Sequence, residues 1–468
     1  MLRLAARRLV AITLLWLALV PATALGHAVP VAQSPPAGGR IAVAPITLTI
    51  RFSETVTLLR DQDLQVLDAS GALVTGGPAR RTPTDAHQVE VSLRPGLPDG
   101  TYTVRWFVVS ADSHPVGGVY VFAIGNGPIG DPYAGALTGG GPGDESVWAV
   151  SARALELMFL GGLVGMLAWR WLVWRPAAAG ASEEALIWGR DLFWSGFGLL
   201  AAGSMLAEGY LLVTKSATLL GTSMLDTLKQ PGEIARVLSE TRFGTLAQVR
   251  ASLLFGVFVI AIWQFLVEMG PNDGERVGLA GRRIPAALMT GLAVATFAAI
   301  SAQGHASTGP VPGLAIAADL VHLVAASVWI TGIAMVLVTL WRAPHVLDDT
   351  GRALAGATLT RYSRIALIAV SATVLAGVAR SLSELSDPAQ LWSSSYGRSI
   401  IYKLLLLCPV AALGLRHKRI ATAVGRVDTP SAAALRMIRR SAALEFVLAL
   451  AIVVIASVLV SQVPGRTG

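Results

Sequence analysis

The chain contains one cysteine, Cys408, among its 468 residues. An internal disulfide, a Cys-x-x-Cys redox motif and a cluster of thiolate metal ligands are therefore excluded. The sequence also lacks the GxxxxGK[ST] phosphate-binding pattern and the phosphorylation-loop signature of ATP-driven cation pumps. Cys408 lies within an apolar run, where we expect an inert, buried thiol. These absences argue against both thiol chemistry and nucleotide binding.

Charged residues are scarce. They make up 14% of the chain, whereas 53% of it is hydrophobic. The mean hydropathy of +0.60 is typical of a membrane protein. The net charge of +8 includes three arginines at the N-terminus, and most of the remaining excess lies in short loops between apolar runs. Basic residues in such loops report membrane topology, so we expect no nucleic-acid partner.

The first 26 residues have the features of a secretory signal peptide. Three arginines precede an apolar run, and Ala24 and Gly26 occupy the −3 and −1 positions of a cleavage site. Cleavage there makes His27 the first residue of the mature protein. Its free α-amine, its imidazole and the first amide then lie close together, and nitrogen donors in a flat arrangement suit Cu(II).

Residues 27–125 are predicted to form an all-β sandwich of Greek-key or immunoglobulin-like type. Several short segments alternate apolar and polar residues, and turns rich in Gly and Pro separate them. The stretch from Trp106 to Gly125 predicts two strands joined by a connection that carries Asp112 and His114. Pro115 favours an extended conformation at His114, so both side chains of this Asp-x-His unit can lean the same way.

Three features of this domain resemble the periplasmic copper-binding family CopC. They are the N-terminal histidine, the segment RFSETV at 51–56 and the segment VVSADSHPVGGVYVFAIG at 108–125. The resemblance covers essentially all of residues 27–125. Some members of the family also have a Met-rich Cu(I) site. No methionine occurs between residues 27 and 157 here, so we expect that second site to be absent.

The resemblance implies which residues bind the metal. His27, Asp112 and His114 would form a Cu(II) site with nitrogen and oxygen ligands. Glu54 would support these ligands from the outer shell of the site. We expect His87, which matches no family motif, to be a surface residue.

The second half of the chain is predicted to lie in a membrane. Residues 126–146 are rich in Gly and Pro and carry no Lys or Arg, which is typical of a flexible tether. Residues 147–462 are expected to form a bundle of eight helices, because each apolar run approaches or exceeds the ~20 residues that cross a bilayer. The expected spans are 147–169, 190–213, 244–267, 284–304, 313–341, 362–383, 399–415 and 441–461.

The orientation follows from two independent signals. A signal peptide places the β-domain and the start of the first span outside the cytoplasm. The loops after the first, third, fifth and seventh spans hold seventeen Lys and Arg, against five in the other three loops, which follows the positive-inside rule. We therefore expect a multi-pass protein of the cytoplasmic (inner) membrane, with the N-terminal domain and the C-terminus on the periplasmic or extracellular side.

Polar residues within membrane spans are costly and are candidates for function. His305 lies at the external end of the fourth span, in SAQGHASTG. In the fifth span, Asp319 and His322 are three residues apart and share a helix face. Three further candidates for a metal path lie in the outer parts of the first two spans: Met158, Met205 and Glu208.

Several segments of this half resemble the CopD copper-transport membrane domain. They are GHA followed by DLVHLVAASVWITG, then YGRSIIYKLLLL and RRSAALEFVLA, and the resemblance covers about residues 147–462. It implies that His305 and His322, with Asp319 beside the latter, handle copper. Gly161 and Gly165 have the spacing that favours close helix packing. Four charged residues are expected to form interhelical ion pairs instead: Arg250, Arg380, Lys403 and Glu445.

These features predict a Cu(II) receiver outside the membrane, joined to a copper permease that contributes to copper homeostasis or resistance. The protein would not be an enzyme. Transport would be passive or coupled to a gradient, with import favoured over export. The partners are copper ions and the lipid bilayer, and a copper chaperone outside the membrane is left open as a donor.

Three alternatives remain open at this stage. The first is a membrane-anchored copper sensor or buffer that does not transport. The second is a copper-dependent redox enzyme with a histidine-brace site, which oxygen consumption in the presence of a reductant would reveal. The third is a haem-bearing electron carrier that uses His305 and His322, which would show a Soret absorption band.

Overall fold

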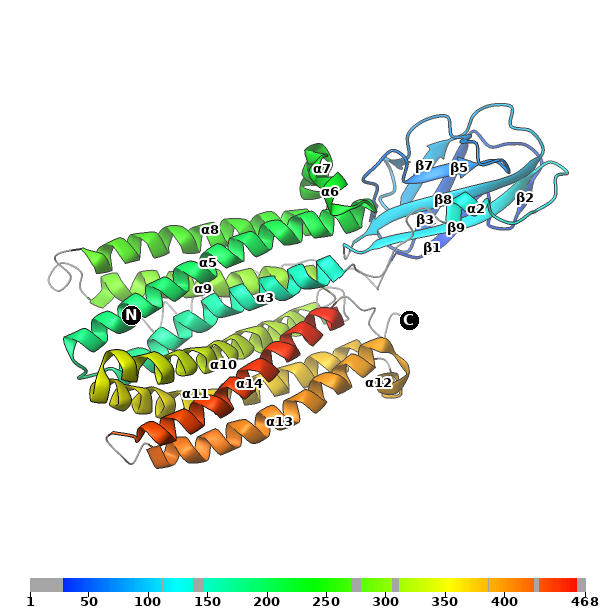
Figure 1. Ribbon diagram of the computed structural model, residues 1–468. Helices are drawn as coiled ribbons and strands as arrows, with labels where there is room; N and C mark the ends of the chain where they lie inside the picture. The colour runs from blue at the N-terminus through cyan, green and yellow to red at the C-terminus, as the bar shows by residue number, and fades with distance from the viewer. Residues whose placement is uncertain are drawn as a thin grey trace.

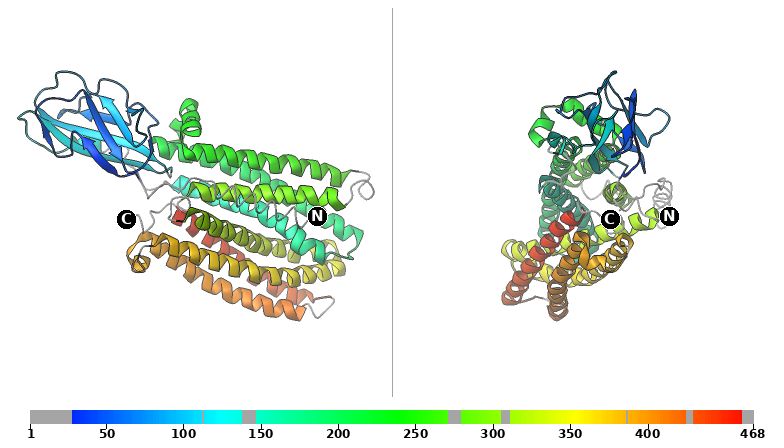
Figure 2. Two further views of the ribbon diagram at one scale, coloured as in Figure 1. Left: turned by 180° about the vertical axis from the view of Figure 1, so that it is seen from behind. Right: turned by 90° about the vertical axis from the view of Figure 1, so that its right-hand side faces the viewer.

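The structure is a computed structural model that describes residues 28–111, 113–137, 147–270, 279–304, 311–385, 387–424 and 429–460. It consists of an N-terminal β-sandwich followed by a helical bundle, as predicted (Figure 1). The sandwich lies beyond one end of the bundle, as Figure 1 and the left view of Figure 2 show. We call this end of the bundle the sandwich end.

The strands of the sandwich form two sheets. The first contains, in spatial order, β1 (Pro30–Ser34), β3 (Thr47–Phe52), β7 (Gln88–Ser92) and β6 (Arg80–Arg81). The second contains β2 (Arg40–Ile41), β9 (Pro115–Ile124), β8 (Gly100–Ser110) and β4 (Val56–Thr57), with β5 (Leu64–Leu67) also paired to β8. The strands in each sheet are mostly antiparallel, and β2 and β9 form a parallel pair.

Alternating residues of these strands form the core between the sheets. In β3, Leu48, Ile50 and Phe52 are buried, whereas the residues between them are less so. The Phe52 ring lies edge-on to Trp106 of β8, with 5.2 Å between the ring centroids. Trp106 and its neighbour Phe107 are both buried. They do not offer the exposed aromatic surface that a polysaccharide-cleaving copper enzyme uses to hold its substrate.

The first part of the expected linker packs against the sandwich. Thr101 Oγ1 of β8 donates a hydrogen bond to Pro128 O (2.5 Å), and Tyr133 N donates to Thr103 Oγ1 (2.9 Å). A short helix follows, α2 (Ala134–Leu137), in which Ala136 is buried. The chain therefore runs along β8 before it continues toward the bundle.

Among the described residues, eight helices are long and apolar enough to cross a membrane, and each overlaps one expected span. The first begins as α3 (Val147–Ala168) and continues through a π-helical segment, η1 (Trp169–Trp174), into α4 (Arg175–Ala177). The others are α5 (Glu183–Leu220), α8 (Arg242–Met269), α9 (Leu279–Gln303), α10 (Pro312–Val346), α11 (Asp348–Glu384), α13 (Ser395–Val424) and α14 (Ala432–Val460). Three short helices were not predicted: α6 (Met224–Leu228), α7 (Pro231–Glu240) and α12 (Gln390–Ser393).

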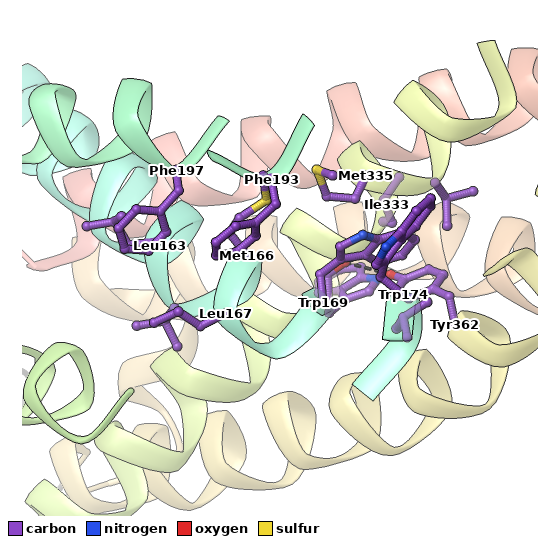
Figure 3. Packing of buried hydrophobic residues seen from close by; sticks show 14 of the residues in the cluster. Leu163, Met166, Leu167, Trp169, Trp174, Phe193, Phe197, Ile333, Met335 and Tyr362 are labelled. Atoms are coloured by element: carbon purple, nitrogen blue, oxygen red, sulfur yellow. Dashed lines mark hydrogen bonds between the residues drawn. The ribbon is translucent and has the colours of Figure 1, made fainter. Parts of the chain in front are cut away.

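Glycines bring α3 and α10 close together. A Cβ atom at Gly165 would collide with the backbone oxygen of Ser327 and the side chain of Thr331, and one at Gly161 would lie 3.2 Å from Ser327 Oγ. The expectation of close packing at these two glycines is therefore confirmed. Aromatic and aliphatic side chains form the largest buried cluster of the described residues. Many of them come from α3, η1, α5, α10 and α11 (Figure 3).

Cys408 does not match its expectation. Its side chain is exposed on the surface of α13, and Sγ lies 3.4 Å from Leu404 O. A membrane helix is apolar on its lipid-facing side as well as on its packed side, so hydropathy alone does not separate the two. The prediction of a buried thiol is therefore wrong.

Candidate metal sites

A tight turn between β8 and β9 fixes the backbone of His114. Ser110 N and Ser110 Oγ both donate hydrogen bonds to His114 O, at 2.9 and 2.8 Å, and His114 N donates back to Ser110 Oγ at 3.2 Å. Ser113, between them, is buried and adopts a left-handed conformation with φ of 66°. Val109 and Pro115 pair across the base of this turn. His114 is thus carried on a sharply closed hairpin.

The first described residues lie beside the loop that carries Glu54. Ser53 N donates to Val29 O (2.9 Å), and Val29 N donates to Ser53 Oγ (3.1 Å). Ala28 and Glu54 are both buried. β4 begins two residues after Glu54 and pairs with β8 at Ser110, the residue that opens the turn. The chain neighbour of His27, the Glu54 carboxylate and the His114 turn therefore lie at one end of the sandwich.

Two of the three predicted Cu(II) ligands, His27 and Asp112, lie outside the described residues. The structure does describe their chain neighbours, Ala28 and Ser113. Over the described ranges, no group of three or more His, Cys, Asp or Glu side chains comes close enough to hold a metal ion. His87 is half-buried just before β7, and its carbonyl accepts a hydrogen bond from Phe52 N (2.8 Å).

The same end of the sandwich contacts the bundle through a hydrophobic cluster. Leu59, which follows β4, and Val109 at the end of β8 are buried there against residues of α3, α5, α7 and α8. We call this set the docking cluster. Its buried members are Leu59, Val109, Ala152, Leu211, Leu219, Leu220, Val237, Phe243 and Ala247. Arg236 of α7 adds a hydrogen bond from Nη1 to Leu59 O (2.8 Å).

Asp63 organises the loop that presents Leu59. Its carboxylate accepts hydrogen bonds from Leu59 N (3.0 Å), Arg60 N (2.9 Å) and Arg60 Nε (3.1 Å). Burial raises the pKa of Asp63 above its ordinary value, and the charge of Arg60 and the two backbone donors oppose that shift. A buried carboxylate with three donors holds a short loop in one conformation, which gives Leu59 a fixed position for docking.

In the bundle, His322 of α10 is held by the neighbouring helix α11. Its Nδ1 lies 2.7 Å from Thr373 O. A carbonyl oxygen can only accept a hydrogen bond, so Nδ1 carries a proton, and whenever the ring is neutral Nε2 keeps its lone pair. This is the arrangement that fixes a metal-binding imidazole. A Cβ atom at Gly377 would lie 3.0 Å from both Nδ1 and Cε1 of the ring, so this glycine makes room for it.

Two charged groups act on His322. Asp319 lies one turn earlier on α10 and accepts a hydrogen bond from Ser301 Oγ of α9. Lys403 of α13 interacts electrostatically with both Asp319 and His322. Sequence analysis assigned Lys403 to an interhelical ion pair. Its electrostatic interaction with Asp319 of α10 agrees with that prediction and also brings it beside His322.

His322 and Lys403 line a cavity of about 600 Å³ between α3, α5, α9, α10, α11, α13 and α14. Met158, predicted from sequence as part of the metal path, also lines it. The other lining side chains are mostly aliphatic or aromatic, and Leu385 and Leu391 border it near the sandwich end. The cavity gives His322 a space into which Nε2 can bind a ligand.

The other predicted residues of the path lie elsewhere. Glu208 of α5 binds the guanidinium of Arg250 on α8, with 3.0 Å from Nε to Oε1. Arg250 is fully buried, with 0% of its side chain exposed, and also contacts Glu156 of α3 and the Gln303 side chain of α9. The expected ion pair of Arg250 is confirmed. Met205 is partly exposed on α5 and is not among the residues that line the cavity. His305 lies outside the described residues.

Comparison with known families gives these two parts their names. The model of the CopC domain matches residues 30–125, which is the sandwich. The model of Copper resistance protein D, CopD, matches residues 356–459. The chain is a fusion of a CopC domain and a CopD domain. The CopD match spans α11 to α14 and so contains Thr373, Gly377 and Lys403, whereas His322 precedes it.

Individual relatives match either most of the chain or only its CopC part. Copper transport protein CutJ of Bacillus subtilis (strain 168) is 27% identical over 410 residues, which are 87% of this chain and 70% of CutJ. Protein YobA of Escherichia coli (strain K12) is 35% identical over 122 residues, which are 24% of this chain and 91% of YobA. The crystal structure of CopC from Methylosinus trichosporium OB3b is 29% identical and covers 21% of this chain and 93% of its own, with a TM-score of 0.19.

The ligand assignment in the CopC domain can be tested by single substitutions in the full-length protein. Asp112→Ala and His114→Ala are each expected to change the electron paramagnetic resonance spectrum of bound Cu(II), because each removes a ligand. His87→Ala is the matched control and is expected to leave the spectrum unchanged. An equal change in the His87 and His114 variants would show that the ligands are assigned wrongly.

Sequence reasoning missed the residues that shape the CopD cavity. Thr373 contributes a backbone oxygen, which no side-chain motif reveals, and Gly377 contributes only the absence of a Cβ atom. The docking cluster was also missed. Its members are ordinary aliphatic residues, whose role depends on a contact between segments far apart in the chain.

Proposed function

We propose that this protein captures copper as Cu(II) outside the cytoplasmic membrane and passes it inward through the CopD domain. In this proposal, the CopC domain is the receiver, and the CopD cavity is the first part of the path. The sandwich end of the bundle then faces the periplasm or the cell exterior. The seventeen basic residues that the sequence analysis assigns to the segments after the first, third, fifth and seventh spans support that orientation.

The observation that carries the proposal is the docking of the ligand-bearing end of the CopC domain on the bundle. Val109 lies in the docking cluster one residue before the 110–114 turn. Ala152 of α3 belongs to the same cluster. Met158 lines the cavity six residues further along α3, which corresponds to about 9 Å of helix. One helix therefore links the receiver to the cavity, so the transfer distance is short.

The donor set of the receiver suits Cu(II). In this proposal His27 supplies an amine and an imidazole, His114 a second imidazole, and Asp112 a carboxylate, and Glu54 is buried at the same end of the sandwich as His114. Mixed nitrogen and oxygen ligands favour Cu(II) over softer ions. The ligands must lose their protons to bind the metal, so we expect affinity to decrease as the pH falls below ~6.5, the ordinary pKa of an imidazole.

The relatives support copper as the cargo. CutJ is named as a copper transport protein, and it matches both halves of this chain. CopD is described as a copper resistance protein. The absence of a nucleotide-binding motif supports transport that is passive or coupled to a gradient.

The experiment that tests the function is a measurement of intracellular copper in cells with and without the protein, over a range of external copper. Transport predicts higher copper accumulation in cells that express it. Equal accumulation, with copper still bound by the purified protein, would contradict transport and favour the sensor or buffer alternative.

Disruption of the docking cluster should slow the passage of copper from the CopC domain to the CopD cavity and leave Cu(II) binding by the CopC domain unchanged. Leu59 is 1% exposed in the cluster, and truncation of a buried leucine costs about 2–5 kcal/mol. We therefore expect Leu59→Ala to weaken docking and to slow copper accumulation while the Cu(II) affinity stays unchanged. Ile46→Ala, at a position that is 85% exposed, is the control. Wild-type accumulation in a well-expressed Leu59→Ala variant would exclude transfer through the docked state.

A further inference from the structure

Two short helices between α5 and α8 lie at the sandwich end of the bundle. They are α6 (Met224–Leu228) and α7 (Pro231–Glu240), and we call them the short-helix pair. They project sideways from the bundle in Figure 1 and in the left view of Figure 2. α7 contacts the CopC domain, because Val237 belongs to the docking cluster and Arg236 donates its hydrogen bond to Leu59 O.

The helices on either side fix the height of the pair along the bundle. α5 ends at Leu220, seven residues or about 10 Å beyond the expected span 190–213. α8 begins at Arg242, two residues or about 3 Å before the expected span 244–267. The headgroup region adds about 5–8 Å to each side of the hydrocarbon core. The chain therefore leaves and re-enters the bundle at headgroup depth or just above it.

α7 packs against the first two turns of α8, where that helix enters the membrane. A Cβ atom at Gly244 would collide with Val237 O and Leu238 Cα of α7. Gln248 Nε2 of α8 donates a hydrogen bond to Leu238 O (2.8 Å). The end of α7 thus lies beside α8 and not beyond it.

The face of α8 that continues from this contact is apolar and exposed. Phe255 lies seven residues after Gln248, so the two residues share a face about 10 Å apart. Phe255 is 62% exposed, and the stripe continues with the exposed side chains of Val259, Ile262 and Leu266. Exposed apolar side chains of a membrane helix contact lipid chains. The short-helix pair therefore lies over the lipid that surrounds α8.

α6 carries the apolar side chains that suit this position. Leu225 and Leu228 are one turn apart and share a face, and they are 71% and 53% exposed. Thr227, by contrast, is buried, and its hydroxyl lies 2.9 Å from Thr222 Oγ1. α6 thus packs on the protein with a polar side chain and leaves its leucines outside. An interfacial helix buries such leucines about 5–10 Å into the boundary between headgroups and chains.

The charges of the pair favour an apolar contact over an electrostatic one. Residues 222–240 contain two basic and three acidic residues. Lys229 forms an ion pair with Asp226 (3.1 Å), and Arg236 is bound to the CopC domain. A segment without excess positive charge gains no affinity from anionic lipids. Its attraction to a membrane should therefore not depend on headgroup charge.

We propose that Leu225 and Leu228 insert into the lipid leaflet at the sandwich end, and that the short-helix pair is an interfacial anchor for the docked CopC domain. The bilayer on one side and Leu59 on the other then hold α7 in a fixed position at the docking cluster. The proposal goes beyond the proposed function, because it concerns a contact with lipid and holds whether or not copper crosses the membrane.

The test measures the surroundings of single spin labels on the full-length protein in vesicles of phosphatidylcholine alone. Cys408, which is exposed, is first replaced by serine, and Leu225→Cys or Leu228→Cys then provides the attachment site. Collision with oxygen, which concentrates in lipid, is compared with collision with a water-soluble nickel complex. Both labels are expected to favour oxygen several-fold more than a label at Ile46→Cys, an 85% exposed position of the CopC domain. Phe255→Cys is the control for a lipid-facing position.

The outcomes separate this inference from its rivals and from the proposed function. Vesicles with added phosphatidylglycerol should give the same result, and lipid contact that required this anionic lipid would contradict an apolar anchor. Nickel collision at Leu225 and Leu228 equal to that at Ile46 would overturn the inference and leave these leucines to a protein partner. Lipid contact by both labels, combined with a failure of cells to accumulate copper, would contradict the proposed function alone.

Discussion

Insertion of one alanine between Gly26 and His27 is expected to weaken Cu(II) binding by orders of magnitude. The inserted residue moves the α-amine away from the imidazole of His27, so the two nitrogens no longer chelate the same ion from one residue. The rest of the domain should be unaffected, because Val29 and Ser53 still pair and Ala28 stays buried. Competition titration of the mature full-length protein, with its first residue verified by mass, measures the effect.

The control for this prediction is an alanine inserted after Gly96, in a turn between β7 and β8 where a side chain would meet open space. That insertion changes the length of the chain without touching the metal site, and Cu(II) affinity should stay as in the wild type. Wild-type affinity in the N-terminal variant would remove the α-amine from the site. His114, Asp112 and Glu54 would then have to hold the ion without it.

His322→Ala is expected to nearly abolish copper accumulation. His322 is the imidazole that lines the CopD cavity, and Thr373 O fixes its tautomer so that Nε2 can bind metal. Alanine removes the ligand and enlarges the cavity without leaving a buried charge, so the protein should still fold. His345→Ala, in the last turn of the same helix α10, is the control. Copper uptake per molecule of membrane-inserted protein is the measurement.

Two companion variants sharpen this result. Gly377→Ala adds a Cβ atom 3.0 Å from the imidazole, so the ring must shift and uptake should fall to an intermediate level. His305→Ala, at the position expected to receive incoming copper first, should slow uptake but leave part of it. Wild-type uptake in a well-expressed His305→Ala, His322→Ala double variant would refute this path and favour the sensor or buffer function.

The sequence allowed the architecture to be predicted because its signals are local. Alternation along β3 and apolar runs of membrane length depend on neighbouring residues in the chain. The position of His114 in a closed turn between two strands also followed from its local sequence. The short helices α6 and α7 were missed, because they have only five and ten residues, far fewer than a membrane span, and lie in a polar segment between two spans.

The CopD cavity could not be predicted in the same way. Its shape depends on which face each helix turns toward its neighbours. Hydropathy does not determine these orientations, because a membrane helix is apolar on all sides. Cys408 was assigned to the interior for this reason and is exposed. The partners of His322 illustrate the same limit, because Thr373 O is a backbone atom on a helix about 50 residues away in sequence. Lys403 was predicted to form an interhelical ion pair, and its place in the lining of the cavity did not follow from the sequence.

The buried Arg250 has a consequence for how the protein is made. An arginine in a lone membrane helix costs about 2.5–3.5 kcal/mol on insertion. Its two carboxylate partners, Glu156 and Glu208, lie on α3 and α5, both of which precede α8 in the chain. During synthesis the acids are thus already in the membrane when the base arrives, and Gln303 of α9 joins them afterwards. The order of the helices therefore lets Arg250 meet its counterions as it leaves the translocon, which would not hold if α8 were made first.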